Sequence, residues 1–269
     1  MLTRMETTPE RTVPLWSVID QVPELHLSRR LTWHACHNVR DLGGLPLPSG
    51  GSTRWRALVR ADDLCRLTAE GQAALVSYGI RTIVDLRAHF ELPEAVHPYR
   101  PPFSGNPIYL HLPPAGDEIA PSRRIVSAPS RKASYRRALE LRRPRYAAIL
   151  SAIARAPEGG VLVHCISGKD RTGLVVALLL ALLGVPDTLI AEDYALSGLY
   201  LQDTHPEMRD AVSLDPSIRG RMAVERLSHP DTMLDALAFI RQQYGSVEEY
   251  LAGADVTEED MQLLQARMT

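Results

Sequence analysis

The chain of 269 residues has few cysteines, few lysines and no long apolar run, and each shortage excludes a class of protein. Its cysteines, Cys36, Cys65 and Cys165, show no CxxC spacing, which argues against a disulfide framework and against a structural zinc site. The longest apolar run, residues 174–183, is too short to span a bilayer, and residues 1–8 lack the apolar core of a signal peptide. We therefore expect a soluble, cytoplasmic protein without an integral membrane segment, and we leave leaderless export open.

Neither sign of charge dominates the whole chain, whose formal net charge is −2. This balance predicts no nucleic-acid partner. A hydrophobic content of 45% and the lack of a Gly/Ser-rich linker are typical of one large core, so we predict a single domain over residues 1–269. Residues 1–30 show no clear period, and we expect a poorly ordered N-terminal extension there.

The bases are nevertheless concentrated in one segment, residues 121–150, where Glu140 is the only acid. They are Arg123, Arg124, Arg131, Lys132, Arg136, Arg137, Arg142, Arg143 and Arg145. Such a segment is usually a solvated helix face. Two other interpretations are an arginine-rich helical lid or insertion over residues 117–155, and a surface that makes peripheral contact with anionic lipid headgroups.

Hydrophobic patterns and turn residues predict an α/β fold. The predicted strands are residues 58–61, 82–86, 108–112 and 161–164, and the predicted helices are 68–78, 133–154, 172–183, 187–198, 231–244, 246–252 and 257–268. Strands and helices alternate in the first two thirds of the chain, and helices alone follow. This order predicts a sheet flanked by helices with a helical C-terminal region, although it does not reveal the strand order.

The segment 164–173, with the sequence HCISGKDRTG, lies between a predicted strand and a predicted helix. Cys165 is therefore followed by a loop that ends at a helix N-terminus, where backbone N–H groups stabilise a thiolate and bind anions by the same field. Arg171 adds a planar guanidinium that matches two phosphate oxygens. The spacing predicts a loop that holds a phosphate against the sulfur of Cys165.

Other residues of this loop have expected roles. Gly168 permits the backbone torsions and the close approach that the loop needs. We expect the Thr172 hydroxyl to donate a hydrogen bond to the sulfur and His164 to orient the loop from behind. Lys169 suits a second anionic group on the substrate, as in phosphoinositides, and the alternative is a lysine that faces water. The remaining members predicted to contact substrate are Ile166, Ser167 and Gly173.

Together with its flanking elements, this loop resembles the signature of the protein-tyrosine-phosphatase superfamily, in its bacterial branch of atypical tyrosine and dual-specificity phosphatases. Segments 38–44 (NVRDLGG), 79–87 (GIRTIVDLR) and 244–251 (YGSVEEYL) resemble that branch in type and order, so the similarity spans about residues 30–255. The segment 60–64 (RADDL) departs from it, because an acid stands where a small neutral residue is commoner. We expect this change to alter the mouth of the site.

The resemblance implies a tyrosine-phosphatase-like fold with a mainly parallel central sheet. It also implies hydrolysis of phosphomonoesters through a phosphocysteine, without metal or cofactor. The implied substrates are phosphotyrosine, phosphoserine/threonine and phosphoinositides, so the implied partner is a phosphorylated protein or lipid. Two alternatives remain: a non-catalytic phospho-ligand binding module on the same loop, and a sulfur-transfer or arsenate-reducing enzyme.

The departing oxygen needs a proton, which a carboxylic acid near the phosphate can supply. Asp170, next to Arg171, is the first candidate for this acid. Asp117 is the alternative because it follows a proline pair and could lie on a mobile loop.

Further polar residues are expected to support the loop. Asp85 and Arg87 follow a predicted parallel strand, so they either face the binding crevice or form a buried ion pair. Asn38, Arg40 and Asp41 are predicted to hold the reactive loop by hydrogen bonds rather than to act on substrate.

Overall fold

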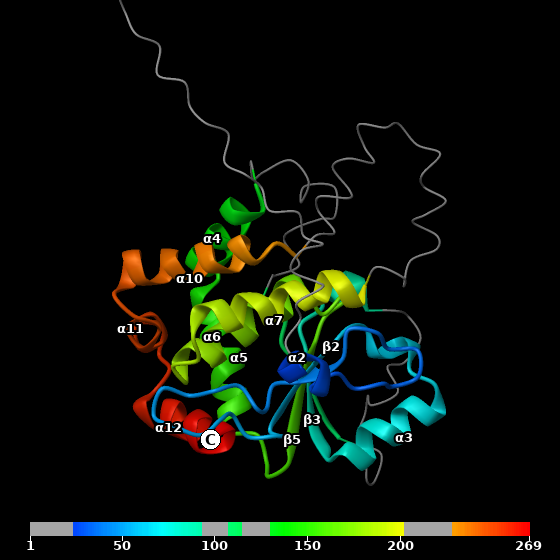
Figure 1. Cartoon of the computed structure of the whole chain (residues 1–269). Coiled ribbons are helices and arrows are strands. Elements are labelled where there is room, and N and C mark those ends of the chain that lie inside the picture. The colour runs from blue at the N-terminus through cyan, green and yellow to red at the C-terminus, as the bar shows by residue number, and fades with distance from the viewer. Residues whose placement is uncertain (1–23, 93–106, 115–129, 202–227) are drawn as a thin grey trace, which may run out of the picture.

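A computed structural model of the chain describes residues 24–92, 107–114, 130–201 and 228–269 (Figure 1). Within these residues five strands form one sheet in the order β1-β2-β5-β3-β4. Their bounds are β1 Arg40–Asp41, β2 Leu58–Ala61, β3 Ile80–Asp85, β4 Ile108–His111 and β5 Gly160–His164. Only the edge pair β1 and β2 is antiparallel, so the sheet is mainly parallel, as the sequence predicts.

The register of the sheet brings the ends of its central strands into line. His164, the last residue of β5, is paired with Ala61 of β2 on one side and with Asp85 of β3 on the other. The carboxyl ends of three parallel strands therefore meet at one edge, which is where α/β sheets bind ligands. The reactive loop follows β5 at this edge.

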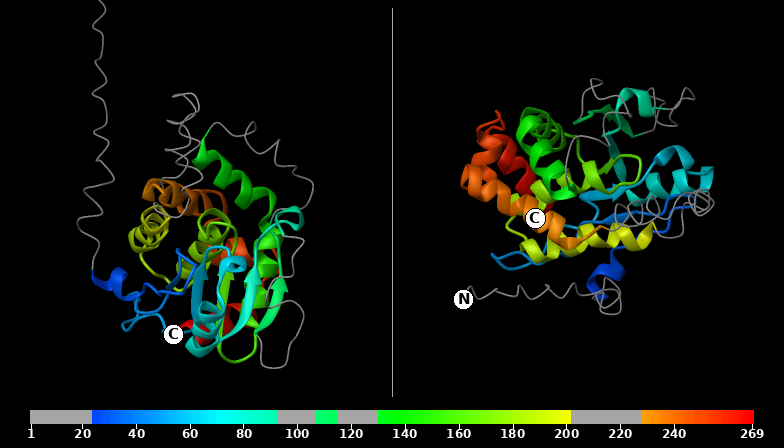
Figure 2. Two further views of the ribbon diagram at one scale, coloured as in Figure 1. Left: turned by 90° about the vertical axis from the view of Figure 1, so that its right-hand side faces the viewer. Right: turned by 90° about the horizontal axis from the view of Figure 1, so that it is seen from above.

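Helices cover both faces of the sheet (Figure 2). They are α2 Glu24–Ser28, α3 Ala69–Tyr78, α4 Arg131–Leu141, α5 Arg143–Ala154, α6 Asp170–Leu182, α7 Asp187–Tyr200, α10 Pro230–Tyr244, α11 Val247–Ala252 and α12 Glu258–Met268, with 3-10 turns η1 Leu64–Arg66 and η2 His89–Glu91. A small core, which includes Leu75 of α3 and Leu162 of β5, lies on one face. A larger core lies on the other, where Val161 and Val163 pack against α5 and α6. No helix of the described segments is long and apolar enough to cross a membrane.

Helix ends follow the signals in the sequence. The side chains of Thr68, Ser246 and Thr257 each accept a hydrogen bond from a backbone N–H three residues on, at 3.3, 3.0 and 3.1 Å. Helix α6 is buried from Thr172 to Leu182, as its uniformly apolar sequence predicts.

Two expectations about the chain need correction. The single helix predicted over residues 133–154 is two helices, because Pro144 stands in the first turn of α5, where its missing N–H and fixed φ are tolerated. The N-terminal extension is structured from residue 24, where α2 leads to the fully buried Arg29. Residues 1–23 and 115–129, which include Asp117, lie outside the described residues.

Candidate active site

The reactive loop connects the end of β5 to the first turn of α6. Cys165 is only 2% exposed, and Asp170 begins the helix. Gly168 has φ +62°, and a Cβ at this position would overlap the carbonyl oxygen of Ala61. Glycine is therefore required both by the left-handed backbone and by the contact with the end of β2.

Three successive carbonyl oxygens of the loop are held from outside. The oxygen of Ile166 accepts from the N–H of Asp63 at 2.9 Å, that of Ser167 from Asn38 Nδ2 at 2.8 Å, and that of Gly168 from Arg60 Nη2 at 2.7 Å. In a planar trans peptide the N–H points opposite to the carbonyl. The next three N–H groups therefore point toward the inside of the loop, which is the geometry of a backbone nest for an anion.

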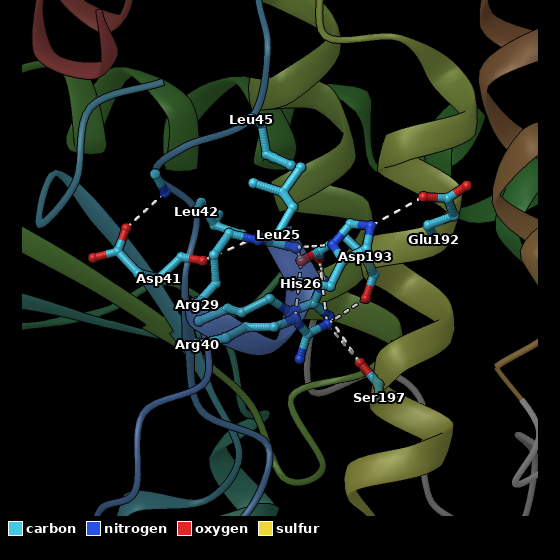
Figure 3. A network of polar contacts seen from close by, with 12 residues as sticks. Leu25, His26, Arg29, Arg40, Asp41, Leu42, Leu45, Glu192, Asp193 and Ser197 are labelled. Carbon is cyan, nitrogen blue, oxygen red and sulfur yellow. Dashed lines mark hydrogen bonds and ion pairs between the residues drawn. The ribbon is translucent and has the colours of Figure 1, made fainter. Parts of the chain in front are cut away.

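A buried ion cluster joins α7 to β1, β2 and the residue after α2, and Figure 3 shows its members Arg29, Arg40 and Asp193. The Asp193 carboxylate of α7 accepts from Arg29 Nη2 at 3.0 Å, Arg40 Nε at 2.9 Å and Arg60 Nη1 at 2.6 Å. Burial alone would raise the pKa of Asp193, but the charges of Arg40, Arg60 and Arg29 hold it well below its usual range. Burial and the charge of Arg40 lower the pKa of Arg60 to about 10, so Arg60 remains a cation at neutral pH.

This cluster also reaches the loop through Asn38. Arg40 Nη1 donates to Asn38 Oδ1 at 2.6 Å and so orients the amide whose other end holds Ser167. Three guanidinium groups surround one carboxylate, so their excess positive charge lies behind the sulfur and the phosphate nest. The structure thus places Asn38 and Arg40 against the loop machinery, together with Arg60, Arg29 and Asp193, which the sequence reasoning did not single out for this task.

Asp41 was also predicted to hold the reactive loop by hydrogen bonds, but its contacts lie elsewhere. Its carboxylate accepts from the backbone N–H of Gly43 at 2.6 Å and of Arg56 at 2.8 Å and from the hydroxyl of Tyr78 at 2.5 Å. Successive residues of a strand point to opposite faces, so Arg40 and Asp41 of β1 serve different regions. Asp41 therefore fixes the turn after β1 and the start of β2 rather than the reactive loop.

Asp85 and Arg87 form a closed, buried ion pair, the second of the two alternatives that the sequence left open. Arg87 Nη2 lies 2.6 Å from Asp85 Oδ2, and Tyr109 donates its hydroxyl to the same oxygen at 2.7 Å. Although burial alone would raise the pKa of Asp85, the neighbouring His164, which becomes a cation in the acid range where Asp85 would take up a proton, and the guanidinium of Arg87 hold it well below its usual range.

His164 connects this pair to the loop, since its Nε2 lies 3.6 Å from Asp85 Oδ2 and its Nδ1 lies 3.2 Å from the Cys165 carbonyl oxygen. Burial lowers the pKa of His164, with Arg87 contributing in the same direction, so the ring is neutral at pH 7. The pair and the imidazole therefore support the loop from behind, where His164 was expected.

Arg171 is held at the opposite side of the loop by Glu91 of η2, a residue that the sequence reasoning missed. Its guanidinium pairs with both carboxylate oxygens of Glu91, with Nη2 to Oε1 at 3.0 Å, and Nη1 donates to the Leu86 carbonyl at 3.2 Å. Burial by itself would lower the pKa of Arg171, but the charges of Cys165 and Glu91 raise it. No local pattern identifies Glu91, because it lies eighty positions from Arg171 in the chain.

Asp170 is bound by helix α4, from within the arginine-rich segment. The Tyr135 hydroxyl donates to Asp170 Oδ1 at 2.6 Å, Arg131 forms an ion pair with the same oxygen, and Lys169 Nζ lies 3.9 Å from Oδ2. Burial alone would raise the pKa of Asp170, but Lys169, Arg131 and the Tyr135 hydrogen bond lower it. The carboxyl group is therefore ionised at neutral pH in the free enzyme.

The structure agrees with some of the roles predicted for the remaining side chains of the loop and differs from others. Lys169 has only 8% of its side chain exposed, so the water-facing alternative is wrong. The Thr172 hydroxyl is buried and makes no hydrogen bond within the described residues, and a bond to the Cys165 sulfur is not formed. A Cβ on Gly173 would lie 3.0 Å from the Tyr194 ring, so this glycine permits α6 to pack closely on α7. Ile166 is exposed.

The acids of segment 60–64 have hydrogen-bond partners within the fold, and their effect on the mouth of the site stays a prediction. Asp62 accepts from Cys36 Sγ at 2.8 Å and from the N–H groups of His37 and Asn38 at 3.0 and 2.9 Å. Asp63 accepts from Arg87 Nη1 at 2.8 Å. Both carboxylates are therefore used to fix the loops that carry Asn38 and Arg87. Within the described residues no cluster of three or more His, Cys, Asp or Glu side chains is suited to a metal ion.

Comparison with known proteins agrees with this geometry. Residues 31–269 match the model of the tyrosine phosphatase family, and the chain belongs to that family of hydrolases. The chain is 31% identical to a tyrosine-protein phosphatase of Nostoc commune, over 79% of its own length and 74% of that protein. It is 28% identical to the triple specificity protein phosphatase PtpB of Mycobacterium tuberculosis, over 75% of its own length and 86% of that protein.

Proposed function

We propose that this phosphatase hydrolyses phosphomonoesters through a phosphocysteine intermediate on Cys165. The observation that carries the proposal is the anchoring of three successive loop carbonyls, which directs N–H groups inward beside a buried cysteine and Arg171. A non-catalytic binding module on the same loop would require the nest and the arginine but neither a nucleophile nor an acid.

In the first step the Cys165 thiolate attacks the phosphorus, so that an S–P bond forms as the bond to the leaving oxygen breaks. Arg171 and the inward N–H groups bind the equatorial oxygens, whose charge they stabilise in the transition state. To do so, Arg171 turns part of its guanidinium from Glu91 to the phosphate. The leaving oxygen takes a proton from Asp170 and departs as a neutral alcohol or phenol.

In the second step water attacks the phosphocysteine, the S–P bond breaks and the thiolate is restored. Asp170 accepts the proton of the attacking water, a role that suits its ionised state. The acid role in the first step requires a bound proton. The incoming phosphate dianion competes with Asp170 for Lys169 and Arg131. This competition raises the pKa of Asp170, so that the carboxyl group takes up a proton when substrate binds.

The proposed substrates are phosphotyrosine, phosphoserine/threonine and phosphoinositides. Lys169 and Arg131 both lie beside Asp170, so cations are available for a second anionic group next to the reacting phosphate. The name of the Mycobacterium tuberculosis relative, a triple specificity phosphatase, supports a broad range for this chain as well.

The experiment is phosphate release by wild type and Cys165→Ser from a phosphotyrosine peptide, a phosphoserine/threonine peptide and phosphoinositides, with chelator present and from pH 5 to 8. We expect release from all three classes by wild type and a loss of at least about a thousandfold in Cys165→Ser. Full turnover by Cys165→Ser would disprove the cysteine mechanism. Binding of phosphopeptide without any release would leave the binding module as the function.

A further inference from the structure

A cavity of about 790 Å³ lies at the edge of the sheet opposite the reactive loop. Ala57, Gly79 and Gly160, which line it, immediately precede or begin β2, β3 and β5, so the cavity is at the amino ends of the strands. Helix α12 closes one side, at the lower end of the sheet in Figure 1. The volume is typical of small-molecule sites. Nothing in the proposed phosphatase reaction uses this region.

Arginine side chains dominate the charge of this cavity. Arg54, Arg56, Arg155 and Arg267 line it, with Glu158 as its acid. Arg155 pairs with Asp260 at 2.6 Å. The other three form no ion pair within the described part of the chain, and Arg267 instead donates to backbone carbonyls, including that of Gly159 at 2.9 Å. The cavity therefore holds cations that have no carboxylate partner there.

Two aromatic rings stand among these cations. Trp55 has 43% of its surface exposed, and its backbone and ring lie so close to Gly43 and Gly44 that a Cβ on either glycine would clash with it. The guanidinium of Arg56 lies 5.1 Å from the centre of the Tyr78 ring. A wall with an exposed indole and guanidinium groups is suited to a flat ring that carries phosphate.

The walls are held in place rather than left to adapt. Buried Asp41 binds the backbone N–H of Arg56 at 2.8 Å and the hydroxyl of Tyr78 at 2.5 Å, and it thereby fixes two lining residues from different elements. Arg56 itself has φ +63°, a left-handed conformation that a non-glycine residue adopts only at a cost. The bonds to Asp41 maintain this conformation and keep the Arg56 side chain beside Tyr78.

We propose that this cavity is a second ligand site that binds a phosphorylated ring compound of nucleotide size. The ring stacks on Trp55, and the phosphates are bound by Arg54, Arg56 and Arg267. The site is separate from the reactive loop, so it does not depend on the proposed substrates of the phosphatase.

The test is calorimetric titration of full-length Arg171→Ala protein, in which phosphate binding at the reactive loop is weakened, with ADP, GDP, pyrophosphate and adenosine. We expect one nucleotide per chain, bound at least about tenfold more tightly than pyrophosphate or adenosine. Adding Arg54→Gln/Arg56→Gln should weaken nucleotide binding by about tenfold or more, since two charge-assisted contacts are lost. As a matched control, the charge-equivalent Lys132→Gln/Arg137→Gln change on α4 should leave it unaltered.

A second readout does not depend on the Arg171→Ala variant. In wild-type protein, nucleotide should quench tryptophan fluorescence, and Trp55→Phe should abolish that quench. Absence of saturable nucleotide binding, unchanged binding in Arg54→Gln/Arg56→Gln, or equal weakening by the α4 control would overturn the site. Equal affinity for ADP and pyrophosphate would refute the stacking on Trp55.

Discussion

At the scale of single residues, Asp170 is the group whose ionisation bears most directly on the proposed reaction. Asp170→Asn removes the acid and base, and we expect turnover to fall by about 10² to 10⁴ for poor leaving groups and much less for acidic phenols, which need little protonation. A series of aryl phosphates with graded leaving-group pKa measures this as a steeper dependence of kcat on leaving-group acidity. An unchanged ratio between good and poor leaving groups would transfer the acid role to Asp117.

A substitution of Tyr135 tests the same carboxyl group through its hydrogen-bond partner. Its hydroxyl stabilises the ionised form of Asp170, so Tyr135→Phe should raise the pKa of Asp170. Because Asp170 then keeps its proton to higher pH, the fall of kcat on the alkaline side should shift to higher pH for a substrate with a poor leaving group. The matched control is Tyr109→Phe, which removes a comparable bond to Asp85 behind the loop. Equal profiles for Tyr135→Phe and wild type would contradict the role of this hydrogen bond.

At the scale of elements, the Asp193 cluster ties α7 to β1, β2 and the end of α2. Asp193→Asn would leave three buried guanidinium groups without their counter-ion, and the expected loss in free energy of unfolding is about 3–5 kcal/mol. Urea unfolding of the variant and of wild type measures this loss in free energy of unfolding. The neighbouring Glu192→Gln breaks only a half-exposed pair with His26, for which we expect about 1 kcal/mol or less. Similar losses in both variants would show that the cluster has no special stabilising role.

The arrangement of the elements also explains why the sequence identified the residues of the reactive loop but not the residues that contact them from elsewhere in the chain. A strand end, a glycine crest and a helix start are local patterns, and they locate Cys165, Gly168 and Arg171 directly. Glu91 and Tyr135 reach the loop from eighty and thirty-five positions away, through a 3-10 turn and helix α4. Their contacts depend on how α4 and η2 pack, which local periodicity does not specify.

At the scale of the whole molecule, the arginine-rich segment is divided between packing and surface. Arg136 pairs with Asp235 of α10, and Arg143 donates to the Tyr250 carbonyl at 2.6 Å while its guanidinium lies 4.6 Å from the centre of the Tyr244 ring. Helix α5 buries Tyr146, Leu150 and Ile153 in the larger core. Much of the segment therefore belongs to the scaffold, and action of α4 as a lid stays a prediction.

Lys132 and Arg137 of α4 are exposed, so they are the residues through which contact with anionic lipid is best tested. With about 1 kcal/mol for each base near an anionic surface, Lys132→Gln/Arg137→Gln should lower activity on phosphoinositide vesicles by about thirtyfold. Activity on a small aryl phosphate should be retained, and Arg54→Gln/Arg56→Gln at the opposite edge of the sheet should leave both activities intact. Parallel losses on vesicles and aryl phosphate would refute contact with the lipid surface.

The sequence by itself determined the α/β class, most helix and strand positions and the reactive loop, because each depends on periodicity, caps or spacing over a few residues. Only the tertiary structure decided the strand order, the partners of Arg171 and Asp170, and the closed pair of Asp85 with Arg87. It also buried Asp62 against Cys36, His37 and Asn38, and it brought Arg54, Arg56 and Arg267 together around one cavity. These outcomes depend on charges and donors that meet from distant segments, and burial, which requires each of them to find a partner, is a property of the packed chain.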